Sequence, residues 1–85
     1  MIAKFENTLK SAGFTRQIEF ADEDNVWHKG DFVVSLDCYG WSMSKYTYDK
    51  AGRVDGGIEL GGGRTTGSLV QALTRHVFNM SKVAL

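Results

Sequence analysis

The chain has 85 residues, of which 42% are hydrophobic and 12% aromatic, and its ten Lys and Arg residues balance ten Asp and Glu residues. A chain of this length supports one hydrophobic core, so we expect a single domain over residues 1–85. The length excludes the larger nucleotide-binding and hydrolase folds. The zero net charge argues against a dedicated nucleic-acid-binding domain, because such domains bind phosphates largely through basic residues.

Membrane and secretion signals are not found in the sequence. The chain has no run of about 18 apolar residues, the length that a membrane-spanning helix requires. The N-terminal stretch MIAKFENTLK lacks the apolar central region of a signal peptide. Cys38 is the single cysteine, so no intramolecular disulfide can form, as is usual in a reducing compartment. These features predict a cytoplasmic protein with no membrane association.

The first predicted element is an N-terminal helix. Gly13 is expected to end it, because glycine adopts the left-handed conformation found after many helices. Phe14 is then placed to fold back on the last turn. Apolar residues recur at helical spacing along one stripe: Ile2, Phe5, Leu9 and Ala12.

After this helix the hydrophobic period changes to the two-residue period of a β-strand. The acidic turn ADEDN separates the first two extended segments, and Gly40 separates a central pair that we expect to form a hairpin. Extended segments are predicted over 15–21, from Val26 onward, over 32–39, over 41–48 and, more weakly, over 54–60.

A second helix is predicted from about Thr66 to at least Phe78. Its stripe consists of Leu69, Leu73, His76, Val77 and Met80. The fold class is therefore α+β: a two-layer sandwich with an N-terminal helix, an antiparallel β-meander of three to five strands and a C-terminal helix. The predicted core sets strand residues Phe32, Val34 and Leu36 against Ile2, Phe5, Leu9, Leu69, Leu73 and Val77.

The stretch LGGGRTTGS, residues 60–68, contains several ingredients of a phosphate-binding loop. Its pattern from Gly62 is G-x-x-x-x-G-S, without the lysine that contacts the phosphates of a nucleotide. We therefore predict no tight binding of nucleoside triphosphates. The favoured interpretation is a glycine-rich loop over 61–67 that ends in a Thr or Ser helix cap, and a weaker anion site using Arg64 stays open.

Two histidines, His28 and His76, are candidates for an acid–base pair in RNA cleavage. Their spacing does not force them together, and His76 lies on the predicted core side of its helix. One Cys and two distant His residues match no zinc-site spacing, so we expect neither a metal nor a cofactor. We predict no catalytic residues.

Candidate protein-binding residues fall into three groups. An acidic turn could imitate nucleic-acid phosphates toward a basic partner. Tyrosines could cover the face of the sheet away from the helices. Apolar residues drift round one flank of the last helix, where they suit a protein partner or a homodimer. The acidic-turn residues are Glu19, Asp22, Glu23 and Asp24; the tyrosines are Tyr39, Tyr46 and Tyr48; and the residues of the last helix are Val70, Phe78 and Leu85.

The order helix, β-meander, helix, with a basic, glycine-containing entry to the last helix, is similar in outline to double-stranded-RNA-binding domains and to the small toxin ribonucleases that share their fold. The RNA-binding domains carry a lysine cluster at the last helix, where this chain has Arg64 and Arg75. The toxins carry a Gly-Ser-His stretch that this chain lacks. The resemblance implies an alternative function in RNA or DNA binding through Arg64, Arg75 and Lys82, and behind it a ribonuclease.

The leading hypothesis is a non-enzymatic binding protein that acts through protein–protein contacts. It is based on the aromatic residues of the short sheet, the neutral charge and the missing catalytic and metal-binding motifs. Small chains with an acidic loop and an aromatic face are typical of phage and mobile-element proteins that inhibit a host factor, including anti-CRISPR proteins. The narrower form of the hypothesis is that this chain is an inhibitor of that kind.

Overall fold

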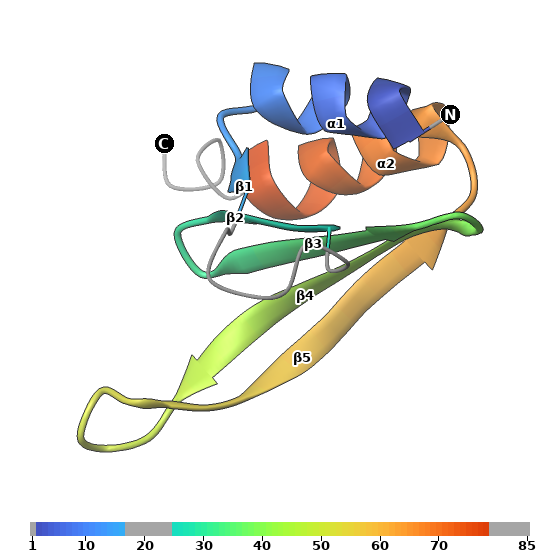
Figure 1. Cartoon of the computed structure of the whole chain (residues 1–85). Coiled ribbons are helices and arrows are strands. Elements are labelled where there is room, and N and C mark those ends of the chain that lie inside the picture. Colours follow the sequence, from blue (N-terminus) through green and yellow to red (C-terminus); the bar gives the residue numbers. More distant parts are fainter. Residues whose placement is uncertain (1, 17–24, 79–85) are drawn as a thin grey trace.

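The protein is represented by a computed structural model that describes residues 2–16 and 25–78. Figure 1 shows a layer of helices on one face of a twisted antiparallel sheet. The predicted α+β class, with a helix before and a helix after a β-meander, is confirmed. The elements are α1 (Ile2–Ser11), β1 (Thr15–Arg16), β2 (Asn25–Lys29), β3 (Phe32–Asp37), β4 (Gly40–Tyr48), β5 (Val54–Gly63), α2 (Thr66–Ala72) and η1 (Leu73–Phe78).

The described strands form one five-stranded sheet in the order β1-β2-β3-β4-β5. Each strand is antiparallel to the next one along the chain, so the predicted meander is correct. The β4–β5 hairpin is the longest part of the sheet, and Figure 1 shows that it projects beyond the helices. None of the described helices is long and apolar enough to cross a membrane.

The end of α1 follows the predicted glycine stop. Gly13 has a φ of 91°, in the left-handed region that favours glycine. The Phe14 amide donates to the Leu9 carbonyl at 2.9 Å, and the Gly13 amide donates to the Lys10 carbonyl at 3.0 Å. These two bonds form a Schellman motif. Phe14 is consequently turned back into the core, where it is buried.

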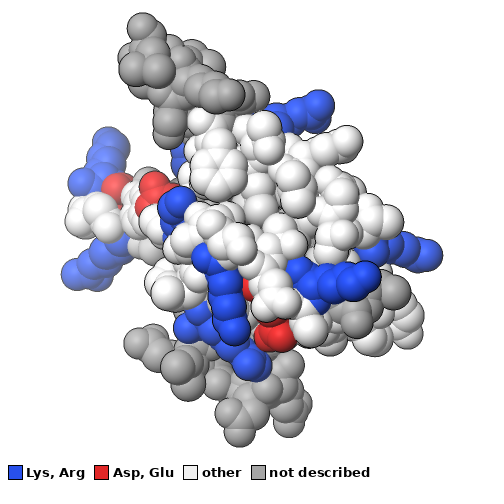
Figure 2. All heavy atoms as spheres, turned by 90° about the horizontal axis from the view of Figure 1, so that it is seen from above, with Lys and Arg blue, Asp and Glu red and all other residues white. Residues whose placement is uncertain are grey.

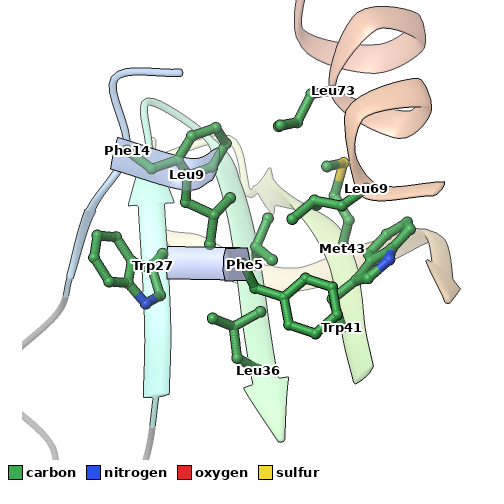
Figure 3. Close-up of a cluster of buried hydrophobic side chains, with 10 residues drawn as sticks. Phe5, Leu9, Phe14, Trp27, Leu36, Trp41, Met43, Leu69 and Leu73 are labelled. Carbon is green, nitrogen blue, oxygen red and sulfur yellow. The ribbon is translucent and has the colours of Figure 1, made fainter. Parts of the chain in front are cut away.

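The core lies between the helices and the sheet (Figure 3). Strand residues Val34 and Leu36 are buried as predicted, and Phe32 is partly buried against the same cluster. Ile2 was expected in the core but is 37% exposed. As the first residue of α1 it has helical neighbours on one side only. The buried cluster consists of Phe5, Leu9, Phe14, Trp27, Val34, Leu36, Trp41, Met43, Leu69 and Leu73.

Both tryptophans belong to this core, although the sequence pattern did not place them there. Trp27 Nε1 donates to Asn25 Oδ1 at 2.6 Å, and Trp41 Nε1 donates to Ser68 Oγ at 3.0 Å. A buried indole needs a partner for its N–H group, and each ring has one. The second bond also fixes the start of α2 to β4.

β5 is longer than predicted, because it continues past Leu60 to Gly63. Gly61, Gly62 and Gly63 pair with Met43, Ser42 and Trp41 of β4, so the expected loop over 61–67 is shorter and begins after the third glycine. The prediction was wrong here because glycines without side chains give no alternating pattern. Strand pairing with β4 determines their structure instead.

The last helix is not uniform. α2 ends at Ala72, and the following turn, η1, is a π-helix, whereas the sequence predicted one continuous α-helix. A π-helix closes its hydrogen bonds over five residues and is therefore wider than an α-helix. Leu73 of this turn is buried and Val77 is partly buried, so the predicted apolar stripe still faces the core. The predicted stripe residue Met80 lies outside the described residues.

Candidate functional site

Two hydroxyl groups of LGGGRTTGS, those of Thr65 and Ser68, are used inside the structure. Thr65 is the N-cap of α2, and its Oγ1 accepts a hydrogen bond from the Ser68 amide at 3.1 Å. Ser68 Oγ donates to the Thr65 carbonyl at 2.8 Å and accepts from Trp41 Nε1. This is the predicted Thr or Ser cap. The stretch therefore joins β5 to α2 and anchors Trp41, and its geometry is explained without a phosphate.

A concave surface lies between α1 and the α2–η1 segment, on the outer side of the helical layer. Its volume is about 420 Å³. Val70 and Phe78, which were predicted as part of one contact surface, both line it, and they are 49% and 39% exposed. The described lining is completed by Asn7, Thr8, Ser11, Ala12, Leu73 and Thr74. We call this surface the inter-helix groove.

One end of the inter-helix groove carries a positive charge. Lys29 Nζ lies 5.2 Å from the centre of the Phe78 ring, within the range of a cation–π contact. The same ammonium donates to the Ala12 carbonyl at 2.8 Å near the end of α1. Figure 2 shows the molecule from the helical side, with an uncharged area in the upper centre of the view and Lys and Arg side chains beside and below it.

Phe78 also borders a second hollow, beyond the Lys29 end of the groove. This hollow has a volume of about 550 Å³ and is lined by Phe32, Lys45 and Val77 as well. Lys45 Nζ lies 5.6 Å from the centre of the Phe32 ring. The two phenylalanines of this hollow, Phe78 and Phe32, thus each have a lysine ammonium over the ring.

The predicted tyrosines do not form one patch. Tyr46 and Tyr48 share one side of β4, the side away from the helices, because buried Met43 faces the helices and strand residues alternate. Tyr39 lies in the turn between β3 and β4, at the other end of β4, and is 77% exposed. Tyr48 Oη donates to Asp31 Oδ1 at 2.6 Å, so its hydroxyl already has a partner within the protein.

The contact with Asp31 raises the pKa of Tyr48 above its ordinary value of 10.0, mainly through the hydrogen bond and secondarily through burial and the carboxylate charge. Folded protein therefore holds this proton more tightly than unfolded chain. The contribution of the Tyr48–Asp31 contact to the free energy of unfolding is therefore complete below pH 10 and is lost as the pH rises above that value. We expect Asp31→Asn to lower the Tyr48 pKa and Asp55→Asn to leave it unchanged, as measured by NMR titration of the tyrosine ring signals.

The remaining sequence-predicted site residues are dispersed. Arg64 borders a small hollow beside Gly63 and Tyr39, whereas Arg75 borders a different cleft between β5 and the helix. The structure therefore does not bring the two arginines to one pocket. The acidic-turn residues Glu19, Asp22, Glu23 and Asp24, and the C-terminal residues Lys82 and Leu85, lie outside the described residues.

The two histidines lie on opposite sides of the sheet. Trp27 of β2 is buried beneath the helices, so the next residue, His28, faces the other way, where it contacts Thr15 Oγ1 at 3.4 Å. His76 belongs to η1, in the helical layer. They cannot act together on one phosphate in this arrangement. Within the described ranges, no group of three His, Cys, Asp or Glu side chains could hold a metal ion.

The α1 side of the groove and the cleft beside Arg75 were missed by the sequence analysis. Thr8 and Ala12, the last residue of the predicted stripe, stand four residues apart and line the groove together, and this spacing was the available signal for it. For the cleft the only signal was the glycine run itself. Both hollows form where segments distant in sequence meet, and a periodicity pattern does not contain that information.

Fold and surface together define a small α+β protein with an apolar groove on its helical layer and an edge strand, β5, whose outer side is paired by no other described strand. Comparison with known proteins gave no match to a protein family, to a curated protein or to a solved structure.

Proposed function

We propose that this chain is a non-enzymatic binding protein that acts through protein–protein contacts made at the inter-helix groove. The observation that carries the proposal is the exposure of Val70 and Phe78 in one concave surface. Removing apolar surface from water is the main driving force of protein association. A partner side chain that fills the groove would cover both residues at once.

The arrangement of side chains in the groove is that of a small interface. Val70, Leu73 and Phe78 form its apolar part, and polar residues such as Asn7 and Thr74 surround them. Protein interfaces commonly have an apolar centre and a polar rim, and a few large side chains carry most of the binding energy. We therefore expect the partner to insert an aromatic or aliphatic anchor.

The proposal includes a cytoplasmic location, which is supported by the single cysteine, Cys38, whose side chain is exposed. The narrower hypothesis, an inhibitor of a host factor encoded by a phage or mobile element, stays a prediction that rests on the small size and composition of the chain. Nucleic-acid binding is the alternative, and the test below separates it from protein binding.

The test is a pair of matched valine substitutions. Val70→Asp places a carboxylate in the groove, whereas Val54→Asp changes a valine of similar exposure, 54%, at the start of β5. We expect tagged protein, incubated with lysate of its own cells after nuclease treatment, to retain a protein partner with Val54→Asp and to lose it with Val70→Asp. A charge cannot be buried in an apolar contact without a large free-energy cost.

The partner is then purified and its affinity for both variants is measured, with circular dichroism to verify that each variant is folded. Equal binding of the two variants would exclude the groove as the contact surface. A protein that is retained from untreated lysate but lost after nuclease treatment would instead support the nucleic-acid alternative. Light scattering at rising concentration shows whether the retained partner is a second copy of the chain.

A further inference from the structure

β5 forms one edge of the sheet. It pairs with β4 on one side, and no strand among the described residues pairs with its other side (Figure 1). A strand at an edge presents unpaired backbone N–H and C=O groups, which can bond to an extended segment of another chain. β5 contains neither proline nor lysine, two residues that commonly prevent such pairing. Its two irregularities in pairing with β4 fall at Asp55 and Leu60, so Gly61–Gly63 pair regularly with β4. The outer edge of Gly61–Gly63 can therefore accept a further strand.

A cleft lies directly above this edge, between β5 and the helical segment α2–η1. Gly61 and Gly62 belong to its strand side, and Gln71, Arg75 and His76 belong to its helical side. Its volume is about 230 Å³. Sites for small molecules usually have volumes of about 300 to 1,000 Å³, so this cleft suits one inserted side chain better than a cofactor or a nucleoside.

The cleft is open because residue 61 is a glycine. Gly61 pairs with Met43, which is buried beneath the helices, so a side chain at position 61 would point toward the cleft. A Cβ atom there would meet the Trp41 ring at 4.0 Å, an ordinary contact distance. Packing within the sheet thus does not require glycine at this position, and a larger side chain would fill the cleft without displacing the backbone.

The charges around the cleft favour an acidic group. Arg75 is exposed and His76 is half-buried, and residues 60–85 contain no Asp or Glu. An arginine side chain can hold a carboxylate through two parallel hydrogen bonds. A strand added to β5 would direct every second side chain to the helical side of the sheet. A carboxylate at such a position would reach Arg75.

We propose that this protein binds an extended acidic segment of a partner protein by strand addition to β5, with an Asp or Glu side chain inserted below Arg75 and His76. The surface is separate from the inter-helix groove, so the inference goes beyond the function proposed above. Either surface can fail its test while the other passes.

The test begins with a yeast-displayed library of random octapeptides, selected on the full-length protein. We expect the enriched peptides to share residues with high β-propensity and one Asp or Glu at a fixed position. The best peptide is then synthesised with its acid intact and with that acid replaced by its amide, Asn or Gln. The amide form should bind about tenfold more weakly or worse, as measured by fluorescence polarisation.

Matched variants of the protein locate the binding site. Arg75→Gln should weaken the acidic peptide about tenfold, whereas Arg16→Gln, which changes an exposed arginine of β1 at the opposite edge of the sheet, should not. Gly61→Val should prevent binding by filling the cleft, and its thermal unfolding verifies that it is folded. Backbone NMR shifts on peptide addition should be largest along Gly61–Gly63.

The proposal would be overturned by no enriched peptide, by enrichment without an acid, by equal binding of the peptide to Arg75→Gln and wild type, or by NMR shifts centred on Val70 and Phe78. A chain that pairs with itself along β5 and excludes the peptide would overturn it as well. Size-exclusion chromatography across the concentrations of the titration detects that outcome. Because Arg75→Gln changes an exposed side chain, the test stays decisive even if Gly61→Val does not fold.

Discussion

Replacing Phe5 with alanine should reduce the free energy of unfolding by about 3 to 5 kcal/mol, the usual cost of removing a buried phenylalanine side chain. Phe5 is among the largest fully buried side chains, and in Figure 3 it projects from α1 among the labelled residues of the sheet. A domain of this size has a total stability of about 4 to 13 kcal/mol. The variant is therefore expected to unfold at a much lower urea concentration than wild type.

Ile2→Ala is the matched control for this experiment, because Ile2 lies on the same helix and the same apolar stripe but is exposed. We expect it to change the free energy of unfolding by roughly 0.5 kcal/mol, as is usual for surface substitutions. If Phe5→Ala and Ile2→Ala have equal effects in urea unfolding followed by circular dichroism, the core described above is incorrect.

Gly40→Ala should be similarly destabilising, for a different reason. Gly40 begins β4 with a φ of 153°, and a Cβ atom added to it would overlap the backbone carbonyl oxygen of Gly63 on β5. A strained backbone conformation and an overpacked contact each cost about 1 to 3 kcal/mol. We expect a loss of about 2 to 5 kcal/mol in urea unfolding, because the obstructing atom belongs to the backbone and cannot rotate away.

Gly67→Ala is the opposite case within the glycine-rich stretch. Gly67 lies in α2, and a Cβ atom there would meet no other atom within 4 Å. Alanine is the better helix former, so this substitution should be neutral or should stabilise the protein by up to about 1 kcal/mol. A harmless Gly40→Ala would contradict the close approach of Gly40 to Gly63, and a destabilising Gly67→Ala would contradict the open space around Gly67.

These glycines show where prediction from sequence succeeded and where it failed. The sequence analysis identified Gly13 correctly as a helix stop, because that role depends on its immediate neighbours and on the apolar residue after it. It assigned Gly61, Gly62 and Gly63 to a loop, whereas they are strand residues paired with β4. Their role depends on a neighbouring strand, and the local pattern contains no sign of it.

The sequence by itself determined the order of helices and strands, the stop of α1 and most of the buried stripe, since each depends on residues a few positions apart. The tertiary structure alone decided which exposed residues share a surface. Val70 joins residues of α1 in the inter-helix groove because α2 packs beside α1, and Arg75 shares a cleft with Gly61 because the last helical segment also packs beside β5. Contacts of that kind depend on the packing of whole elements, so hydrophobic periodicity could not predict them.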